Sequence, residues 1–347
     1  MSRHVYQSAA GGKQLVPLEL TARLVGRSAT PRLAQMLSWK YSHCSAQLVS
    51  EDFTLNHARA LSRGLVQTLS AKVAQLATET EAHWHYALPD FKEPVTHLAI
   101  SRDGVMVPLR QGGWRESMCG TISFYDRHGE RLHTLYRGGA PEYGKKAFNE
   151  MMDKEIAAVK AQYPGLVCIG LADGAADNWT YLLPLTQVQI LDFYHASQYL
   201  GAVAEALPLF AAERQAWLQT WCHRLKNEQH GVERVLSELA SQQGRCSTSQ
   251  RADKTHPLQK ALTYFAHNQG RMRYAYYLQK GYPIGSGVTE AACKVLVKQR
   301  LACSGMRWHT PGVARMLHLR GVVCTHGRWQ QLWRKIDHRQ ATNFTSD

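Results

Sequence analysis

The chain has 347 residues, of which 44% are hydrophobic, and its 41 lysines and arginines against 27 acids give a formal charge of +14. A chain of this length forms two domains, or one large domain with an insertion, and its apolar content predicts a packed core and excludes wholesale disorder. Because basic side chains attract phosphates at long range, the charge favours a polyanionic partner such as DNA.

Membrane, export and zinc-finger signals are missing from the sequence. No run of eighteen apolar residues occurs, which predicts that no helix crosses a membrane. Residues 1–14 lack the apolar centre of a signal peptide, so we expect a cytoplasmic protein. The eight cysteines are scattered without a C-x-x-C pair, which argues against a zinc finger and against a disulfide framework.

Residues 1–90 are predicted to form an N-terminal helical region. TPRLAQMLSWKY and NHARALSRGLVQTLSAKVAQL carry apolar residues at helical spacing, with Ser28 and Asn56 as predicted caps. Residues 42–65 predict two short helices joined by a turn, with Arg59 and Arg63 on the second. A helix-turn-helix that binds DNA and a plain helical bundle both fit this pattern.

Residues 91–199 alternate between strand and helix patterns. VTHLAISRDG is predicted to be a strand ending at Asp103, and SMCGTISFYD and RLHTLYRGG form a hairpin around residues 127–130. KKAFNEMMDKEIAAVKAQY predicts an amphipathic helix, and LVCIGLAD a buried strand ending at Asp173. A short helix at NWTYLL and a strand at VQILDF follow. This order predicts a mixed α/β fold with helices on the faces of a mixed sheet.

The remaining chain divides into an insertion and a C-terminal part. Residues 200–280 predict a helical insertion, interrupted by the polar stretch SQQGRCSTSQRADKTH. Residues 281–347 are predicted to complete the core. They begin with the glycine-rich turn GYPIGSG, which re-aims the chain into a helix carrying Glu290, and end in the basic tail GRWQQLWRKIDHRQ.

The order of elements in the core is that of the ribonuclease H-like fold. In that fold one acid lies on the first strand, a second at the end of the strand after the first helix, and a third on a later helix. Asp103, Asp173 and Glu290 occupy these places. Their carboxylates suit two Mg²⁺ ions, or Mn²⁺, about 3.5–4 Å apart, which support phosphodiester cleavage.

Each acid also has a structural interpretation when it is taken alone. Asp103 and Asp173 each precede a glycine, a common arrangement in turns. Glu290 is equally explained as a helix-start acid paired with Lys294 at i+4. The three acids together, in the order of the fold, favour the metal site.

Four stretches resemble a known family: SRDGVMVPLR, LADGAADNW, ILDFYHASQYL and YPIGSGVTEAACKVLVKQRLACSGMRW. They are similar to the ISKra family of bacterial insertion-sequence transposases, which is related to the Mutator-like group, and the resemblance extends over residues 15–335. It implies an Asp-Asp-Glu enzyme that cuts and joins double-stranded DNA at transposon ends and target. The resemblance further implies that the protein works as a homo-oligomer on DNA.

Other residues are expected to support this site. The resemblance implies a supporting role for Asp192 and His195, with a helix cap as the alternative for Asp192. Asp192 is also the substitute second ligand should Asp173 not serve, and Asp126 and Asp177 are weaker candidates. DNA phosphates are expected to contact a basic track formed by Lys294, Lys298, Arg300, Arg307 and Trp308. Within this track, Trp308 is expected to stack on an unpaired base.

Two other classes of function remain open. Members of the family carry more sequence ahead of their PLE segment, so we expect a shortened copy or a late start, which would affect recognition of transposon ends. A DNA-binding remnant without catalysis is therefore one alternative. A ribonuclease H-like nuclease or resolvase is another, and a two-carboxylate glycosidase is a distant third because the basic charge suits sugars poorly.

Overall fold

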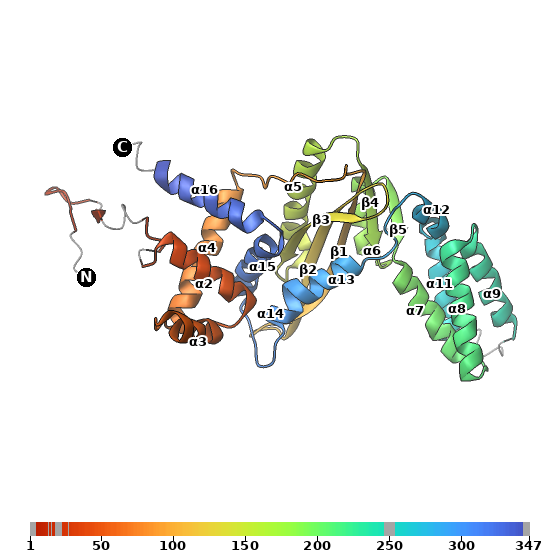
Figure 1. Ribbon diagram of the computed structural model, residues 1–347. Helices are drawn as coiled ribbons and strands as arrows, with labels where there is room; N and C mark the ends of the chain where they lie inside the picture. The colour runs from red at the N-terminus through yellow and green to blue at the C-terminus, as the bar shows by residue number, and fades with distance from the viewer. Residues whose placement is uncertain are drawn as a thin grey trace.

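The computed structural model describes residues 5–12, 14, 16–17, 23–26, 28–245 and 254–342. Figure 1 shows an elongated molecule, with the N-terminal helices at one end, a sheet in the middle and the helical insertion at the other end. The predicted α/β class, with a mixed sheet between helices, is confirmed. No helix within these residues is long and apolar enough to cross a membrane.

A five-stranded sheet with the order β3-β2-β1-β4-β5 forms the centre. β2 lies antiparallel between β1 and β3, whereas β4 and β5 run parallel to β1. The predicted hairpin is closed by a bond from the Asp126 amide to the Glu130 carbonyl. The strands are β1 (His97–Pro108), β2 (Trp114–Tyr125), β3 (Arg131–Gly139), β4 (Val167–Ala172) and β5 (Val188–Leu191).

The two predicted helices of the core are present as α5 (Lys146–Gln162) and α6 (Ala176–Leu182). A third helix, α7 (Phe193–Ala206), begins at the last residue of the predicted strand VQILDF. α5 buries Phe148, Met152 and Ile156 in the same apolar cluster as the inner residues of β1 and β2. This cluster holds the strands in one register, because slipping by one residue would turn their apolar side chains outward.

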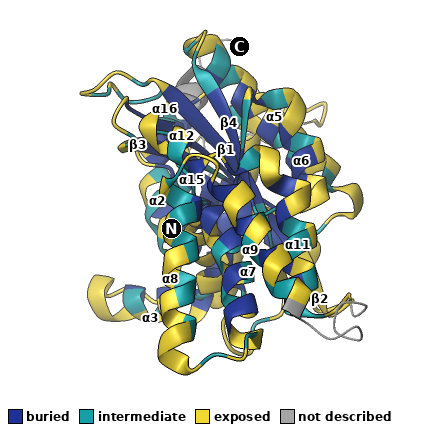
Figure 2. Cartoon of the chain, turned by 90° about the vertical axis from the view of Figure 1, so that its right-hand side faces the viewer, coloured by how far each residue is buried: buried dark blue, intermediate teal, exposed yellow. Residues whose placement is uncertain are grey.

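The insertion is helical, as predicted. It contains α8 (Ala211–Asn227), α9 (Gly231–Arg245), α11 (Pro257–Asn268) and α12 (Tyr274–Gln279). The predicted boundary at residue 200 falls inside α7, since α7 is one helix that runs from the core into the insertion. Residues 246–253 of the polar break lie outside the described residues. Figure 2 shows the insertion helices with exposed outer faces in front of the buried strands β1 and β4.

The N-terminal region contains α2 (Pro31–His43), α3 (Ala46–His57) and α4 (Arg63–Glu81). The predicted caps are wrong: Thr30 caps α2 and Ser62 caps α4, each accepting a backbone amide with its hydroxyl. No helix begins at Asn56, because Asn56 belongs to the last turn of α3, which ends at His57, and the chain turns at Ala58 with φ 47°.

The C-terminal part contains α13 (Gly287–Ala292), the π-helical segment η4 (Cys293–Lys298), α14 (Gln299–Leu301), α15 (Thr310–Cys324) and α16 (Arg328–Thr342). Trp329, Leu332 and Trp333 of α16 are buried in one apolar cluster with α2, α3 and α4. The basic tail therefore has an apolar face, and the two ends of the chain share a core.

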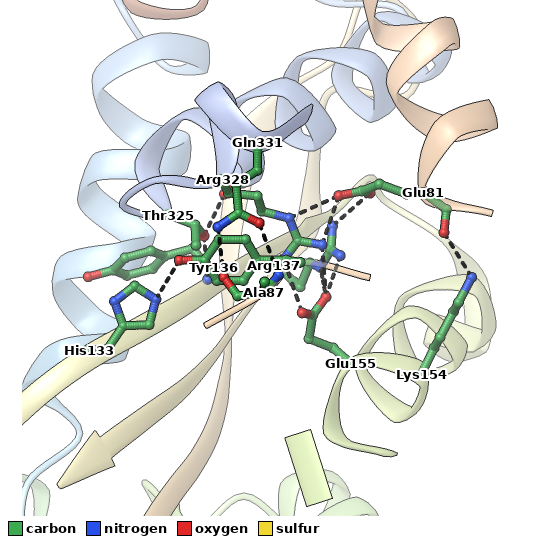
Figure 3. A network of polar contacts seen from close by, with 12 residues as sticks. Glu81, Ala87, His133, Tyr136, Arg137, Lys154, Glu155, Thr325, Arg328 and Gln331 are labelled. Atoms are coloured by element: carbon green, nitrogen blue, oxygen red, sulfur yellow. Dashed lines mark hydrogen bonds and ion pairs between the residues drawn. The ribbon is translucent and has the colours of Figure 1, made fainter. Parts of the chain in front are cut away.

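A buried ion network fastens this shared core to the sheet (Figure 3). Arg137 of β3 and Arg328 of α16 both bind Glu155 of α5, with nitrogen–oxygen distances of 2.8 Å and 3.0 Å. Both arginines also bind Glu81 of α4, at 3.2 Å and 2.9 Å. Each carboxylate thus has two guanidinium partners, which is how proteins accommodate buried charge.

Candidate active site

Asp103 and Asp173 lie on neighbouring parallel strands. β1 pairs with β4 from His97 opposite Val167 to Ile100 opposite Gly170. Asp103 is three residues beyond the last residue of β1 that pairs with β4, and Asp173 directly follows β4, so both acids lie at the same end of this strand pair. They are close enough for the Asp173 carboxylate to act electrostatically on Asp103.

One expectation about Asp103 is corrected. β1 does not end at Asp103 but continues to Pro108, and Asp103 pairs with Cys119 of β2. The strand extends because β2 supplies pairing partners for it beyond the end of β4. The alternative of a turn acid is therefore wrong for Asp103, whose carboxylate lies on the sheet itself.

The electrostatics of Asp103 differ from those of a surface acid. Burial raises the pKa of its carboxyl group, and the nearby Asp173 carboxylate raises it further. The Gly104 amide, which donates to Asp103 Oδ1 at 2.7 Å, the Cys293 thiol and His195 oppose this rise. Two acids that repel each other at a half-buried position are arranged for a cation, because a cation would relieve the repulsion.

Asp173 follows β4 and begins a turn, as the sequence predicts. Its Oδ1 accepts the Ala175 amide at 3.1 Å and the Asn178 side-chain amide at 3.2 Å. Gly174 has φ +104°, a conformation that glycine adopts without strain. The Tyr264 hydroxyl of the insertion donates to the Asp173 carbonyl at 2.9 Å. The insertion therefore helps to position the second acid.

The helix of Glu290 packs against the strand of Asp103. The Cys293 thiol, one turn after Glu290, lies 3.6 Å from Asp103 Oδ2. Thr289 is hydrogen bonded to Thr121 of β2 at 2.7 Å. Glu290 itself is half exposed, accepts the Ser286 hydroxyl at 3.2 Å and lies 3.9 Å from His195 Nε2. The ion pair of Glu290 in the structure is thus with His195, and not with Lys294 as the structural interpretation expected.

The glycine-rich turn before Glu290 is held at several points. Gly281, with φ +70°, packs so closely on the β2–β3 hairpin that a Cβ atom there would lie 2.8 Å from the Arg127 carbonyl oxygen. The Ile284 carbonyl accepts the Phe193 amide at 2.8 Å. These contacts fix the direction in which the helix starts, as predicted from the sequence.

Asp192 and His195 connect the turn to the acids. Asp192 is fully buried, and its Oδ1 caps α7 by accepting the His195 amide at 2.9 Å. Its Oδ2 accepts both the amide and the hydroxyl of Ser286. The cap interpretation of Asp192 is confirmed, and because its oxygens are engaged it does not replace Asp173 as a ligand. His195 lies close enough to act electrostatically on both Asp103 and Glu290.

The weaker acidic candidates have structural partners. Asp126 Oδ1 accepts the amides of His128 and Glu130 in the hairpin, at 2.8 Å and 2.9 Å. Asp177 pairs with Lys145 and Arg102, both at 2.9 Å. Neither acid belongs to the group around Asp103.

The predicted basic track is only partly on the surface. Lys294, Lys298 and Arg307 are exposed, so their predicted phosphate contacts stay predictions. Arg300 is corrected, since it is 2% exposed and donates to the Tyr41 carbonyl at 3.0 Å. Its guanidinium lies between the rings of Tyr41 and Trp308, at 4.8 Å and 5.1 Å from their centroids.

Trp308 is corrected in the same way. Its indole nitrogen donates to the Leu301 carbonyl at 3.0 Å, and its backbone pairs with the chain at the end of β1. Trp308 therefore packs the end of the helix against the sheet, and the expected stacking on a base is replaced by stacking on Arg300.

Sequence reasoning missed the residues that hold the Glu290 helix. The π-helical segment frees the carbonyls of Val295 and Leu296, and the buried Arg320 of α15 donates to both, at 2.8 Å for Leu296. Arg320 also donates to the Ser42 carbonyl at the end of α2. The only signal in the sequence was one of several basic residues in a helix, which also contains Arg315 and His318, and this is too common to single out Arg320.

Asp103 thus has Asp173 as a neighbour on one side, and the helix of Glu290 reaches Asp103 through Cys293 and, with His195, from the other. Within the part of the chain that the structure describes, no three His, Cys, Asp or Glu side chains stand in a metal-binding arrangement. The donor chemistry nonetheless fits Mg²⁺ or Mn²⁺, since carboxylate oxygens are the ligands these ions prefer and the acids repel one another.

Comparison with known proteins adds no relative to this description. No protein-family model matches the chain, and no curated protein matches it either.

Proposed function

We propose that this protein is a DNA transposase of an insertion sequence, which cleaves and joins DNA strands with Asp103, Asp173 and Glu290. The observation that carries the proposal is geometric: Asp103 and Asp173 lie at the same end of two neighbouring parallel strands, and the Cys293 thiol, one turn after Glu290, lies 3.6 Å from Asp103 Oδ2. The family resemblance of the sequence and the charge of +14 favour double-stranded DNA as the substrate.

The core is proposed to be ribonuclease H-like. The strand order β3-β2-β1-β4-β5, with three antiparallel strands followed by two parallel ones, supports this assignment. In such a sheet ligands bind at the carboxyl ends of the parallel strands, and that is where Asp173 and Asp192 lie.

Each residue of the site has a distinct task in this proposal. Asp103, Asp173 and Glu290 would hold two Mg²⁺ ions, which when bound supply an activated water or 3′-hydroxyl and stabilise the leaving oxygen. His195 orients Glu290 and balances its charge. Asp192 is a positioning residue, because it fixes Ser286 at the start of the Glu290 helix and caps the helix that carries His195.

The decisive test is the variant Glu290→Gln, which keeps the size of the side chain and removes its charge. We expect the variant to fold and to bind DNA, but to lose Mg²⁺-dependent cleavage by about 10³-fold or more, because charge compensation at the reacting oxygens is lost. Glu150→Gln is the matched control, since Glu150 is an exposed helical acid with a lysine four residues away.

The readout is cleavage and strand transfer with labelled DNA ends from the flanks of the gene. Cleavage retained by folded Glu290→Gln protein would refute the proposal. Cleavage by the wild type without strand transfer would instead identify a nuclease on the same site.

A further inference from the structure

A groove of about 670 Å³ lies between the N-terminal helices and the segment that follows the Glu290 helix. Its walls come from parts of the chain far apart in sequence: α2 to α4, the end of β1, and residues 305–319. We call it the arginine groove, for its residues Arg63, Arg110, Arg300, Arg307 and Arg315.

The charge of the arginine groove is of one sign. Five arginines and one histidine line it, and none of the described residues that line it is Asp or Glu. Arg63, Arg110, Arg307 and Arg315 are exposed, and within the described part of the chain no ion pair involves their side chains. Arg137 and Arg328, by contrast, each pair with carboxylates in the core. The clustered groove arginines have no carboxylate partner among the described residues, which leaves their guanidinium groups able to pair with an external anion.

Two further features of the groove suit an anion. Ser70 is 1% exposed, lines the groove, and its hydroxyl has no hydrogen-bond partner among the described residues. Helix α15 begins at the groove with His309, whose side chain makes no capping bond. A free hydroxyl and the positive end of a helix both favour phosphate oxygens.

The groove continues from the acidic site. It lies at the far end of the strand that carries Asp103, because Arg110 follows β1, and at the far end of the helix that carries Glu290. Arg110 is seven positions after Asp103 along β1 and the extended residues that follow it, a span of about 23 Å at the rise of a strand. This is about two thirds of one turn of a DNA duplex of roughly 34 Å. The exposed Lys294 and Lys298 lie on the helix between the two ends.

We infer that the arginine groove binds the phosphate backbone of the same DNA duplex whose scissile phosphate reaches Asp103 and Asp173. This inference rests on the proposed function for the identity of the polyanion. It assigns to α2, α3 and α4 a role different from a separate DNA-reading module, since these helices form one wall of a groove shared with the core.

The test is the triple variant Arg63→Gln, Arg110→Gln and Arg315→Gln, studied without divalent cations so that only binding is measured. We expect weaker binding to duplexes of any sequence. The slope of log affinity against log salt should fall by about 2.7, since each lost phosphate contact removes about 0.9. The control removes three exposed basic residues outside the groove: Lys92→Gln, Arg131→Gln and Arg234→Gln.

The outcomes separate this inference from the proposed function. If wild type binds DNA and the triple variant shows the same salt slope, the inference that the arginine groove binds DNA is overturned. The catalytic proposal then still stands. A wild-type protein that binds no duplex at any salt concentration would overturn both. Circular dichroism of the triple variant establishes that it is folded. Each of the three arginines replaced singly should lower the slope by about 0.9.

Discussion

Two clusters of carboxylates in this molecule are built in opposite ways. Glu81 and Glu155 lie among Arg137, Arg328 and His318, which join four helices to the sheet (Figure 3). Asp103 and Asp173 have each other as neighbours, and no guanidinium or ammonium group of the described residues is among the groups that act most strongly on Asp103.

The pKa values follow this difference. Burial raises the pKa of Glu81, but the guanidiniums of Arg137 and Arg328 outweigh burial and bring it down to about 2. Burial also raises the pKa of Asp103, and there the neighbouring carboxylate adds to the rise. Compensated acids can be buried at little net cost as long as every partner is kept, whereas a buried acid next to another acid is unfavourable and is typical of functional sites.

The largest effect that would test this contrast is on activity. Asp103→Asn should reduce Mg²⁺-dependent DNA cleavage by about 10³-fold or more, because a charged ligand is lost at the reacting centre. Asp177→Asn, at an exposed acid with basic partners, should cleave at close to the wild-type rate. Equal losses in the two variants, measured on folded protein, would remove the distinction between Asp103 and the other acids.

The second prediction concerns stability and the cluster of Glu81 and Glu155. Arg328→Met leaves two buried carboxylates with one fewer partner, which should lower the free energy of unfolding by about 3–5 kcal/mol. Asp103→Asn should leave it unchanged or raise it, since a repelling charge is removed. Urea denaturation gives both values. An Arg328→Met protein as stable as wild type would show that the network contributes no net stability.

The smallest effect concerns cations. At 10 mM Mg²⁺ and a dissociation constant of about 1 mM, binding to the native state should add about 1.4 kcal/mol to the free energy of unfolding. Asp103→Asn should abolish this increase. Arg328→Met should retain it, because that variant loses a partner of Glu81 and Glu155 and no residue of the proposed cation site. Thermal denaturation with and without Mg²⁺ measures the effect, and an increase that survives in Asp103→Asn would place the cation outside this site.

Patterns along the chain were sufficient for most of the fold. Alternation and apolar runs located all five strands, and helical spacing located α5, α6 and the insertion. The end of β1 was missed because the residues after Asp103 are strand-like only in the presence of β2. The caps at Thr30 and Ser62 were missed because several serines and asparagines nearby satisfy the same rule.

The site was predictable where topology alone decides proximity. The proximity of Asp103 and Asp173 can be predicted because the two acids belong to the ends of neighbouring parallel strands. The burial of Arg300 could not be predicted in this way, since only the packing of Tyr41 and Trp308 shows that its guanidinium faces inward. The contacts of the buried Arg320 with backbone carbonyls could not be predicted either, because they depend on a π-helical segment that no sequence pattern predicts.

The shared core of the two chain ends has a consequence for the order of synthesis. Val66 and Val73 of α4 pack in one cluster with Trp333 and Ile336 of α16. At 5–20 residues per second, a ribosome reaches the second pair roughly 13 to 54 s after the first. During that interval α4 lacks the apolar surface it finally covers. An interrupted translation product therefore leaves this surface uncovered, and we expect chaperones and proteases to act on it.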